Sequence, residues 1–288
     1  MNSIKKQLNT ALLVNDMSMM NFKGKNIFYD IQGEGKPVLI LNGIMMSTRS
    51  WEPFVETLSE HNMLIRLDFL DQGQSDKMDK PYTQDLQVDV IYHLLKDIKI
   101  ERVNIVGISY GGEVALLFAK TYPKMVERMV LFNTTPYTSP WLKEIGYQWN
   151  SIGKTRDAKT YYQATIPVIY SPSYYEKRLD WMKKREEFLL PIFGNPVFLD
   201  AMERLTNSAE TFDIRKDIER ITCPTLLIAA DEDYLTPIKN QQELHRLMKE
   251  SELVILPGVG HASMYEKPLL FTTLVIGFIN AKQTVYPI

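Results

Sequence analysis

Cysteine, histidine and long apolar runs are scarce in this sequence, and each scarcity excludes a class of protein. Cys223 is the only cysteine among 288 residues, so no intramolecular disulfide can form. No segment approaches 18 consecutive apolar residues, so the sequence predicts no stable membrane insertion. Four scattered histidines and a single cysteine provide no metal-ligand cluster. We therefore expect a cytoplasmic protein that uses no metal.

Excess charge of either sign is also missing. The chain carries 33 basic and 35 acidic side chains, well mixed, with a formal net charge of −2. Such a balance gives no basic field for nucleic acid or for an anionic membrane, so neither is an expected partner. No strand pattern is followed by Gly-x-Gly-x-x-Gly, which excludes that type of dinucleotide site. The sequence thus predicts no cofactor, and it leaves the oligomeric state open.

Short apolar runs alternate with helical patterns in the first and last parts of the chain. Residues 38–41, 103–106 and 225–229 have the composition of strands that are buried on both faces. Helical patterns lie between such runs, with one around residues 51–59 and another ending at Ile98. This alternation predicts an α/β fold with a mostly parallel central sheet and helices on both faces.

The alternation stops in the middle of the chain, where only helical patterns occur. We expect a core domain formed by residues 1–135 and 211–288, interrupted by a helical insert at residues 136–210. The insert holds 13 of the 31 aromatic residues. These rings indicate either an apolar ceiling over a partly hydrophobic substrate or simple packing of the insert helices on one another. The charged run 183–187 predicts a solvated helix face.

The motif Gly107-Ile108-Ser109-Tyr110-Gly111 follows a buried strand and opens into a helical stretch. A serine raised on a sharp strand-to-helix turn has strained backbone angles and needs flanking residues with almost no side chain. Such a serine can act as a nucleophile, and the backbone N–H of Tyr110 would then face the developing oxyanion. The motif also occurs by chance in ordinary turns. Its position between strand and helix favours the nucleophile.

A nucleophilic serine needs a base, and His261 has the best position among the four histidines. It follows the apolar run 253–256 and a glycine-containing loop, which places it at the carboxyl edge of the predicted sheet, where open α/β sheets bind their ligands. His61, His93 and His245 lie in a loop or on polar helix surfaces.

The acid that orients this base should lie between Ser109 and His261 in the chain. Three carboxylates, Asp231, Glu232 and Asp233, follow the predicted strand 225–229. Asp233 has the loop position of a buried acid that holds the correct histidine tautomer, and we favour it. Asp231 stays an alternative, and Glu232 is expected to be an exposed loop charge.

A second candidate oxyanion donor follows the strand 38–41, in the stretch Asn42-Gly43-Ile44-Met45. A glycine at the strand end lets the chain turn so that the Ile44 N–H points at the nucleophile. Together with Tyr110 it would form an oxyanion hole. The alternative is a plain turn that only ends the strand.

With these residues placed, the sequence resembles the serine-nucleophile branch of the α/β-hydrolase superfamily over nearly all of its length outside the insert. Residues 107–112 look like the nucleophile motif of that family, 230–237 like its acid loop and 258–261 like its histidine loop. Residues 68–75 are similar to its Asp-x-x-Gly-x-Gly-x-Ser pattern, with Asp71 in place of the first glycine. The resemblance implies an α/β-hydrolase fold in which the insert is a helical lid.

The function expected from this reasoning is hydrolysis of a small-molecule carboxylic ester, or a related acyl compound, through an acyl-Ser109 intermediate. Two short stretches, 42–45 and 73–75, are similar to the acyltransferase that joins hydroxyacyl chains in rhamnolipid biosynthesis. Acyl transfer to an alcohol is therefore the alternative. A receptor that keeps the pocket without turnover is a third possibility.

Overall fold

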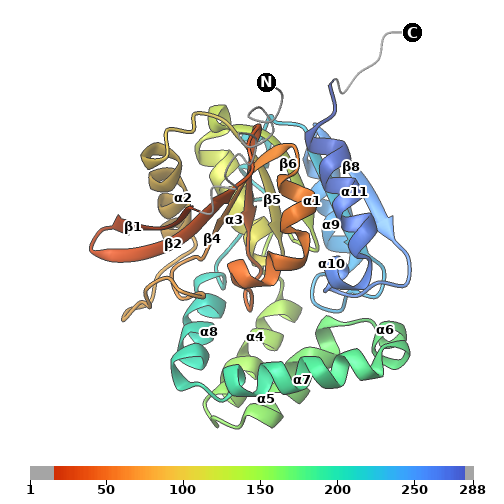
Figure 1. Cartoon of the computed structure of the whole chain (residues 1–288). Helices are drawn as coiled ribbons and strands as arrows, with labels where there is room; N and C mark the ends of the chain where they lie inside the picture. The colour runs from red at the N-terminus through yellow and green to blue at the C-terminus, as the bar shows by residue number, and fades with distance from the viewer. Residues whose placement is uncertain (1–15, 283–288) are drawn as a thin grey trace, which may run out of the picture.

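The computed structural model describes residues 16–282 and places an eight-stranded sheet at its centre (Figure 1). The strand order is β1-β2-β4-β3-β5-β6-β7-β8. The first two strands form an antiparallel hairpin, β2 pairs antiparallel with β4, and the other neighbours are parallel. The predicted mostly parallel α/β fold is confirmed. The strands are β1 (Asp16–Phe22), β2 (Lys25–Gln32), β3 (Lys36–Leu41), β4 (Asn62–Leu67), β5 (Val103–Ile108), β6 (Val126–Phe132), β7 (Thr225–Ala230) and β8 (Ser251–Leu256).

The central strands are buried on both faces, as their continuous apolar runs predict. Successive side chains of a strand point to opposite faces, so each strand contributes to two separate cores. In β3, Leu39 and Leu41 join the core on one face, whereas Val38 and Ile40 join the core on the other.

Helices cover both faces of this sheet (Figure 1). The helices α2 (Asp85–Asp97), α3 (Tyr110–Thr121) and α9 (Ile238–Leu247) contribute buried residues to the first core. The helices α1 (Val55–Ser59) and α11 (Pro268–Ile279) contribute to the second core, next to the short α10 (Ser263–Glu266). The helix predicted at residues 51–59 is a 3-10 helix as far as Phe54, and only its second half is α1.

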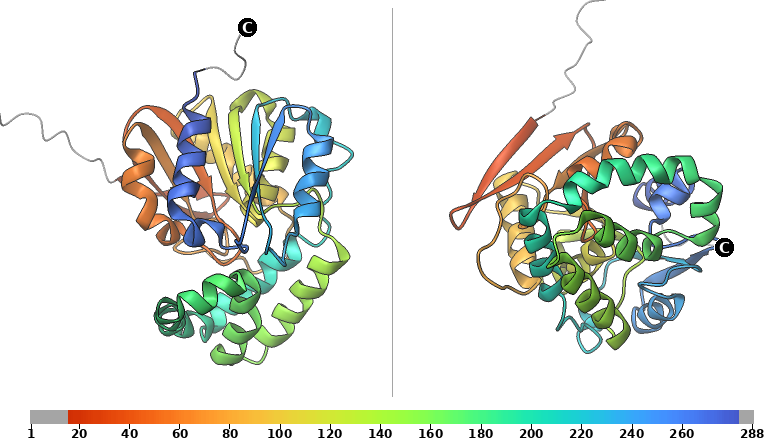
Figure 2. Two further views of the ribbon diagram at one scale, coloured as in Figure 1. Left: turned by 90° about the vertical axis from the view of Figure 1, so that its right-hand side faces the viewer. Right: turned by 90° about the horizontal axis from the view of Figure 1, so that it is seen from below.

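Five α-helices between β6 and β7 form a separate layer below the sheet in Figure 1, and the view from below in Figure 2 shows them covering that end. Where this insert joins the core, Thr138 N–H donates to the Phe212 carbonyl (2.9 Å). Four of the five begin at a side-chain N-cap, each worth about 1 kcal/mol: Ser139, Asp157, Ser171 and Asn195. The helices are α4 (Pro140–Gly153), α5 (Ala158–Ile169), α6 (Pro172–Lys177), α7 (Leu179–Phe193) and α8 (Pro196–Ser208).

Some aromatic residues of the insert pack on one another, and others line a cavity. Tyr161 and Tyr162 are buried and pack against Phe193 inside the insert. Trp149 and Tyr170 instead line a cavity that faces the core. The prediction of a solvated face for residues 183–187 is wrong for Arg185, which is half-buried among aromatic rings because it lies on the inner side of α7.

Residues 1–15 and 283–288 belong to the expected core segments but lie outside the described residues. In residues 16–282, no helix combines the length and apolarity needed to cross a membrane. Within the same residues, no group of three histidine, cysteine, aspartate or glutamate side chains is arranged to hold a metal ion.

Candidate active site

Ser109 stands at the sharp turn between β5 and α3, with φ 53° and ψ −119°. A positive φ is strained for a residue with a side chain, so the surrounding structure must hold it in place. The N–H of Ser109 donates to the Phe132 carbonyl on β6 (2.9 Å), and its own carbonyl accepts from the Gly112 N–H (2.8 Å). The predicted strand-to-helix turn at this serine is therefore present.

The glycines around Ser109 allow backbone segments to approach closely. A Cβ atom on Gly111 would overlap the Leu41 carbonyl oxygen at the end of β3, and a Cβ atom on Gly107 would lie 2.8 Å from the Gly111 oxygen. Leu41 is fixed in the sheet and Gly111 in the first turn of α3, so neither carbonyl can move freely. Only glycine fits at these two positions, as the motif predicts.

His261 and Asp233 are brought together from two different loops. The Nδ1 atom of His261 lies 2.7 Å from Oδ2 of Asp233, and both side chains are buried. The same carboxylate accepts from the Asn133 amide (2.8 Å), from the Leu235 N–H (2.8 Å), and from the Thr236 N–H (2.9 Å) and hydroxyl (2.8 Å). The sequence analysis did not identify Asn133. The one feature that could have indicated it is its position directly after β6, at the carboxyl edge of the sheet.

These contacts set the charge of Asp233. Burial alone would raise its pKa, but the positive charge that His261 carries when protonated, the hydrogen bond from its ring and the other donors outweigh burial and hold the pKa below its ordinary value. Asp233 is thus ionised at neutral pH. An ionised acceptor fixes the proton of His261 on Nδ1 and leaves Nε2 free to accept a proton.

The two neighbouring carboxylates have different roles. Asp231 is exposed and accepts from the backbone N–H groups of Gly258 (2.7 Å) and Val259 (3.2 Å), so it holds the loop that carries His261. Glu232 is half-buried, where the sequence predicted an exposed side chain, and its backbone N–H donates to the Val259 carbonyl of the neighbouring loop (2.9 Å).

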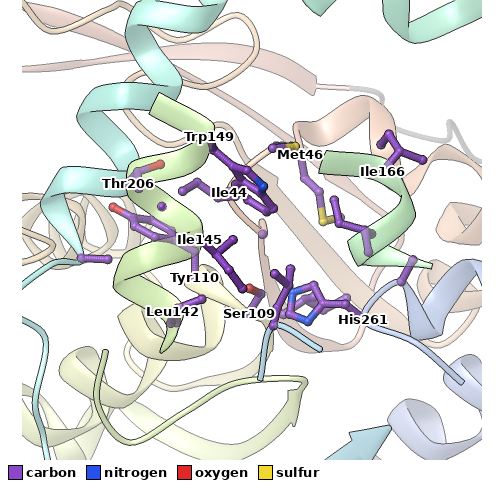
Figure 3. A pocket seen from close by; sticks show the side chains of 18 of the residues that line it. Ile44, Met46, Ser109, Tyr110, Leu142, Ile145, Trp149, Ile166, Thr206 and His261 are labelled. Atoms are coloured by element: carbon purple, nitrogen blue, oxygen red, sulfur yellow. The ribbon is translucent and has the colours of Figure 1, made fainter. Parts of the chain in front are cut away.

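Ser109 and His261 line one cavity of about 160 Å³ between the core and the insert. Figure 3 shows the two side chains next to each other at one end of this cavity. The other walls are mainly apolar; they come from the loop after β3, from the insert helices α4, α5, α7 and α8, and from the segment after His261. Labelled wall residues are Ile44, Met46, Leu142, Ile145 and Trp149.

The two predicted oxyanion donors belong to residues at the same cavity, Ile44 and Tyr110. Among residues 16–282, neither backbone N–H has a hydrogen-bond acceptor. The carbonyls of Gly43 and Ile44 are held by the side-chain amide of Gln72 (2.9 and 3.3 Å). Two N–H groups without an internal acceptor therefore belong to residues that line the same cavity as Ser109.

A buried network fixes this loop to the sheet. The Asn42 amide donates to the Gln72 side-chain oxygen (2.9 Å) and to the Leu67 carbonyl (2.9 Å), and it accepts from the Trp51 indole (2.7 Å). Sequence reasoning did not identify Gln72, which occupies a variable position of the 68–75 pattern. Its role depends on a partner 30 residues away.

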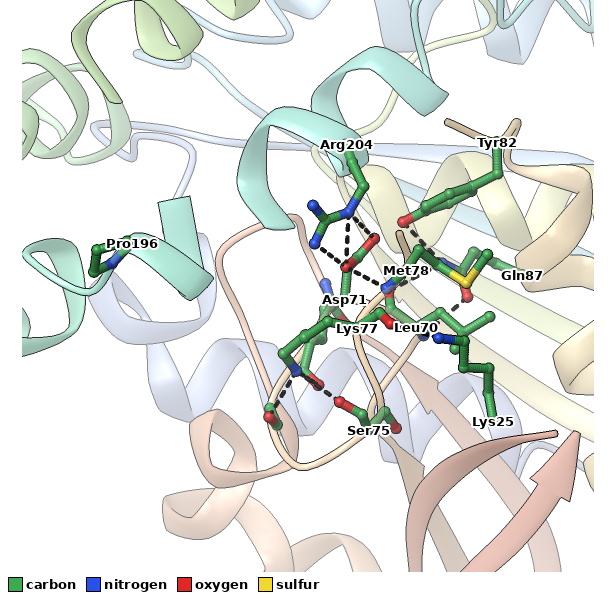
Figure 4. A network of polar contacts seen from close by, with 12 residues as sticks. Lys25, Leu70, Asp71, Ser75, Lys77, Met78, Tyr82, Gln87, Pro196 and Arg204 are labelled. Carbon is green, nitrogen blue, oxygen red and sulfur yellow. Dashed lines mark hydrogen bonds and ion pairs between the residues drawn. The ribbon is translucent and has the colours of Figure 1, made fainter. Parts of the chain in front are cut away.

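Asp71 and Arg204 connect the core to α8 (Figure 4). The two side chains form a two-pronged ion pair with N–O distances of 2.6 and 3.1 Å, and the carboxylate is fully buried. Asp71 has φ 73°, so it adopts the backbone conformation for which the family pattern has glycine. A second link joins the Tyr110 hydroxyl to Ser208 on the same helix (2.9 Å).

Glu113 is a buried acid at the same cavity, one helical turn beyond Ser109. Burial raises its pKa to about 8, although the Gln84 amide, donating at 2.6 Å, favours the charged form. At neutral pH the side chain is therefore mostly a neutral acid. The sequence analysis missed it because a glutamate in the first turn of a helix is common.

Known proteins resemble this chain over most of its length. The family model described as alpha/beta hydrolase fold matches residues 36–268. MGS-M2, an alpha/beta hydrolase enzyme from a Medee basin deep-sea metagenome library, has a crystal structure that is 49% identical, with a TM-score of 0.93 over 94% of this chain and all of its own. A Bacillus subtilis (strain 168) protein, provisionally named 2-succinyl-6-hydroxy-2,4-cyclohexadiene-1-carboxylate synthase, is 28% identical over 88% of this chain and 95% of its own.

The sheet, the turn at Ser109 and these similarities are those of the alpha/beta hydrolases. The chain belongs to the alpha/beta hydrolase fold family, and it is an enzyme of that family.

Proposed function

We propose that this protein is a serine hydrolase that cleaves a carboxylic ester or a related acyl compound, with Ser109, His261 and Asp233 as a catalytic triad. One observation carries the proposal. Ser109 stands on a positive-φ turn beside His261, and the Nδ1 of His261 is bonded to the buried Asp233 at 2.7 Å. A hydroxyl, an imidazole and an ionised carboxylate in this order are the groups that nucleophilic acyl transfer needs.

In the proposed reaction, His261 Nε2 takes the proton of the Ser109 hydroxyl while its oxygen attacks the substrate carbonyl. The negative oxygen that forms is stabilised by the N–H groups of Ile44 and Tyr110. The imidazolium then gives its proton to the departing alcohol, and an acyl-Ser109 intermediate remains. Water, activated by the same imidazole, attacks this intermediate, releases the carboxylic acid and restores the serine.

The cavity supports a substrate with a hydrophobic part. Its volume of about 160 Å³ and its apolar walls suit a short acyl chain or one ring. The insert forms the side of the cavity opposite the sheet, and we propose that it acts as a lid that limits access of water to the acyl intermediate. If exclusion of water is complete enough, an alcohol replaces water as the acceptor, which is the acyltransferase alternative.

The test compares Ser109→Ala with Ser151→Ala, which removes an exposed hydroxyl on α4. We expect Ser109→Ala to lose turnover of 4-nitrophenyl butyrate and labelling by a fluorophosphonate, while its circular dichroism and thermal unfolding stay those of the wild type. Ser151→Ala should keep both the turnover and the labelling. Retained labelling in the Ser109→Ala protein would contradict the proposal. A wild-type protein that is not labelled would instead support the receptor alternative.

A further inference from the structure

A second, larger cavity adjoins the one that contains Ser109. It has a volume of about 940 Å³ and lies between the inner side of the insert and the loops after β3 and β4. The two cavities share part of their walls, so they lie next to each other. The shared residues are Met45, Met46, Arg185, Leu189, Phe193 and Tyr265.

Arg185 is the only charged residue in this shared wall. Its guanidinium carbon lies 5.1 Å from the ring centre of Tyr265 and 5.9 Å from those of Trp181 and Phe188. Contacts of a cation with ring faces stabilise it and fix its orientation, but they satisfy none of its N–H donors. The three rings therefore hold the charge at the boundary of the two cavities.

In residues 16–282, no carboxylate lies within 4.0 Å of the Arg185 guanidinium, and its buried Nε has no hydrogen-bond partner. The other arginines at buried or half-buried positions have hydrogen-bond partners: Arg66 binds Asp30 and Arg204 binds Asp71, both at 2.6 Å, and Arg128 donates to the Phe278 carbonyl (2.9 Å). A half-buried cation without an anion is costly unless another molecule provides one. A planar guanidinium prefers a carboxylate, which it can bind through two parallel hydrogen bonds.

The wider charge distribution of the larger cavity favours an anion as well. Four cationic side chains line it, namely Arg49, Lys77, Arg178 and Arg185, against two carboxylates. Of these two, Asp71 is already paired with Arg204, and Asp68 accepts hydrogen bonds from the backbone N–H groups of Thr48 (2.6 Å) and Gln74 (2.8 Å). The unpaired charge that remains is positive.

We infer that Arg185 binds a carboxylate of the substrate, remote from the carbonyl that Ser109 attacks. The inference rests on the proposed function and narrows it: the substrate is an acyl compound that bears a free carboxylate, and Arg185 determines this specificity. The alternative is that Arg185 only covers the aromatic rings of the insert and contributes stability. The two roles predict different outcomes for charged and neutral substrates.

The kinetic test uses two anionic esters, each with its methyl-ester counterpart. The first is 4-acetoxybenzoate, with the carboxylate in the alcohol part, and the second is monophenyl glutarate, with the carboxylate in the acyl part. For at least one of the two pairs, we expect the wild type to have a higher kcat/KM for the anionic ester than for its methyl ester. Arg185→Gln should lower kcat/KM for that anion about ten- to a hundredfold, mainly through KM, and leave the neutral ester within about threefold.

Two further variants separate charge from geometry. Arg185→Lys keeps the positive charge but cannot donate two parallel hydrogen bonds. It should therefore keep only part of the wild-type preference for the anionic ester. Lys184→Gln removes a charge from the exposed neighbouring position of α7 and should leave the preference unchanged. Equal losses for anionic and neutral esters in Arg185→Gln, or a wild type without preference, would overturn the inference.

A binding test needs no turnover and so distinguishes this failure from a failure of the proposed function. The amide analogues 4-acetamidobenzoate and glutaric acid monoanilide are titrated into the wild type and into Arg185→Gln by calorimetry. We expect the wild type to bind one analogue at least tenfold more tightly than the variant, with no such difference for its methyl ester. Equal binding by both proteins would refute a carboxylate site even if the esterase activity is real.

Discussion

The carboxylate of Glu266 accepts two hydrogen bonds from Ser171, one from its backbone N–H (2.9 Å) and one from its hydroxyl (2.6 Å). The same carboxylate accepts from the Gly260 N–H (3.1 Å), directly before His261. One buried carboxyl group therefore joins the turn between α5 and α6 to the loop that carries the proposed base. Displacement of the insert at this point would displace the histidine loop.

Glu266→Gln tests this connection. The amide has the shape of the carboxyl group but replaces one acceptor oxygen with an NH2 donor. At least one of the hydrogen bonds from Ser171 or Gly260 is then lost, because its N–H or O–H donor faces the NH2 group. We expect kcat for 4-nitrophenyl butyrate to fall about tenfold with a smaller change in KM, and the unfolding temperature to decrease. Glu187→Gln, an exposed change on α7, is the matched control. A variant with lower stability but unchanged kcat would show that Glu266 has only a structural role.

Asp233→Asn should lower kcat by about four orders of magnitude, because an amide cannot hold the correct tautomer of His261 or balance its positive form. Asp231→Asn removes only the charge that holds the loop backbone, and we expect a loss within about tenfold. Steady-state kinetics of both purified variants decides the assignment. The opposite ranking would transfer the role of the acid to Asp231.

Gln72→Ala should impair the proposed oxyanion site without touching the triad. It removes the amide that holds the carbonyls of Gly43 and Ile44, so the Ile44 N–H loses its fixed direction. We expect kcat to fall about ten- to a hundredfold, less than the full loss of one oxyanion donor. Gln74→Ala, at an exposed position of the same loop, should be neutral. Equal activity of both variants would argue against this support role.

Glu113 gives the folded protein a pH-dependent stability. Its pKa of about 8 in the folded state exceeds its ordinary value of 4.5, so the folded protein binds the proton more strongly than the unfolded chain does. This contribution is complete below pH 4.5 and is lost as the pH rises to about 8. Denaturant unfolding from pH 5 to 8 should show a steeper loss for the wild type than for Glu113→Gln. Parallel curves would contradict the assigned shift.

Local patterns in the sequence predicted the framework correctly. The apolar runs identified β3, β5, β7 and β8, and the glycines around Ser109 identified the sharp turn, because both depend on neighbours within a few residues. The prediction of Asp233 agrees with its contact to His261, since the ends of parallel strands meet at one edge of a sheet. The predicted exposure of Glu232 was wrong, because the burial of this side chain depends on the neighbouring loop that carries His261.

The sequence alone therefore predicted how strands and helices alternate along the chain, the sharp turn at Ser109, and which residue types lie at the carboxyl edge of the sheet. The tertiary structure decided how the insert is tied to the core: Asp71 meets Arg204 across 133 positions of the chain, and Ser171 meets Glu266 across 95. It also turned Arg185 inward, although its charged neighbours predict a solvated face. Such contacts depend on how whole helices pack against the sheet, and no spacing along the chain encodes that orientation.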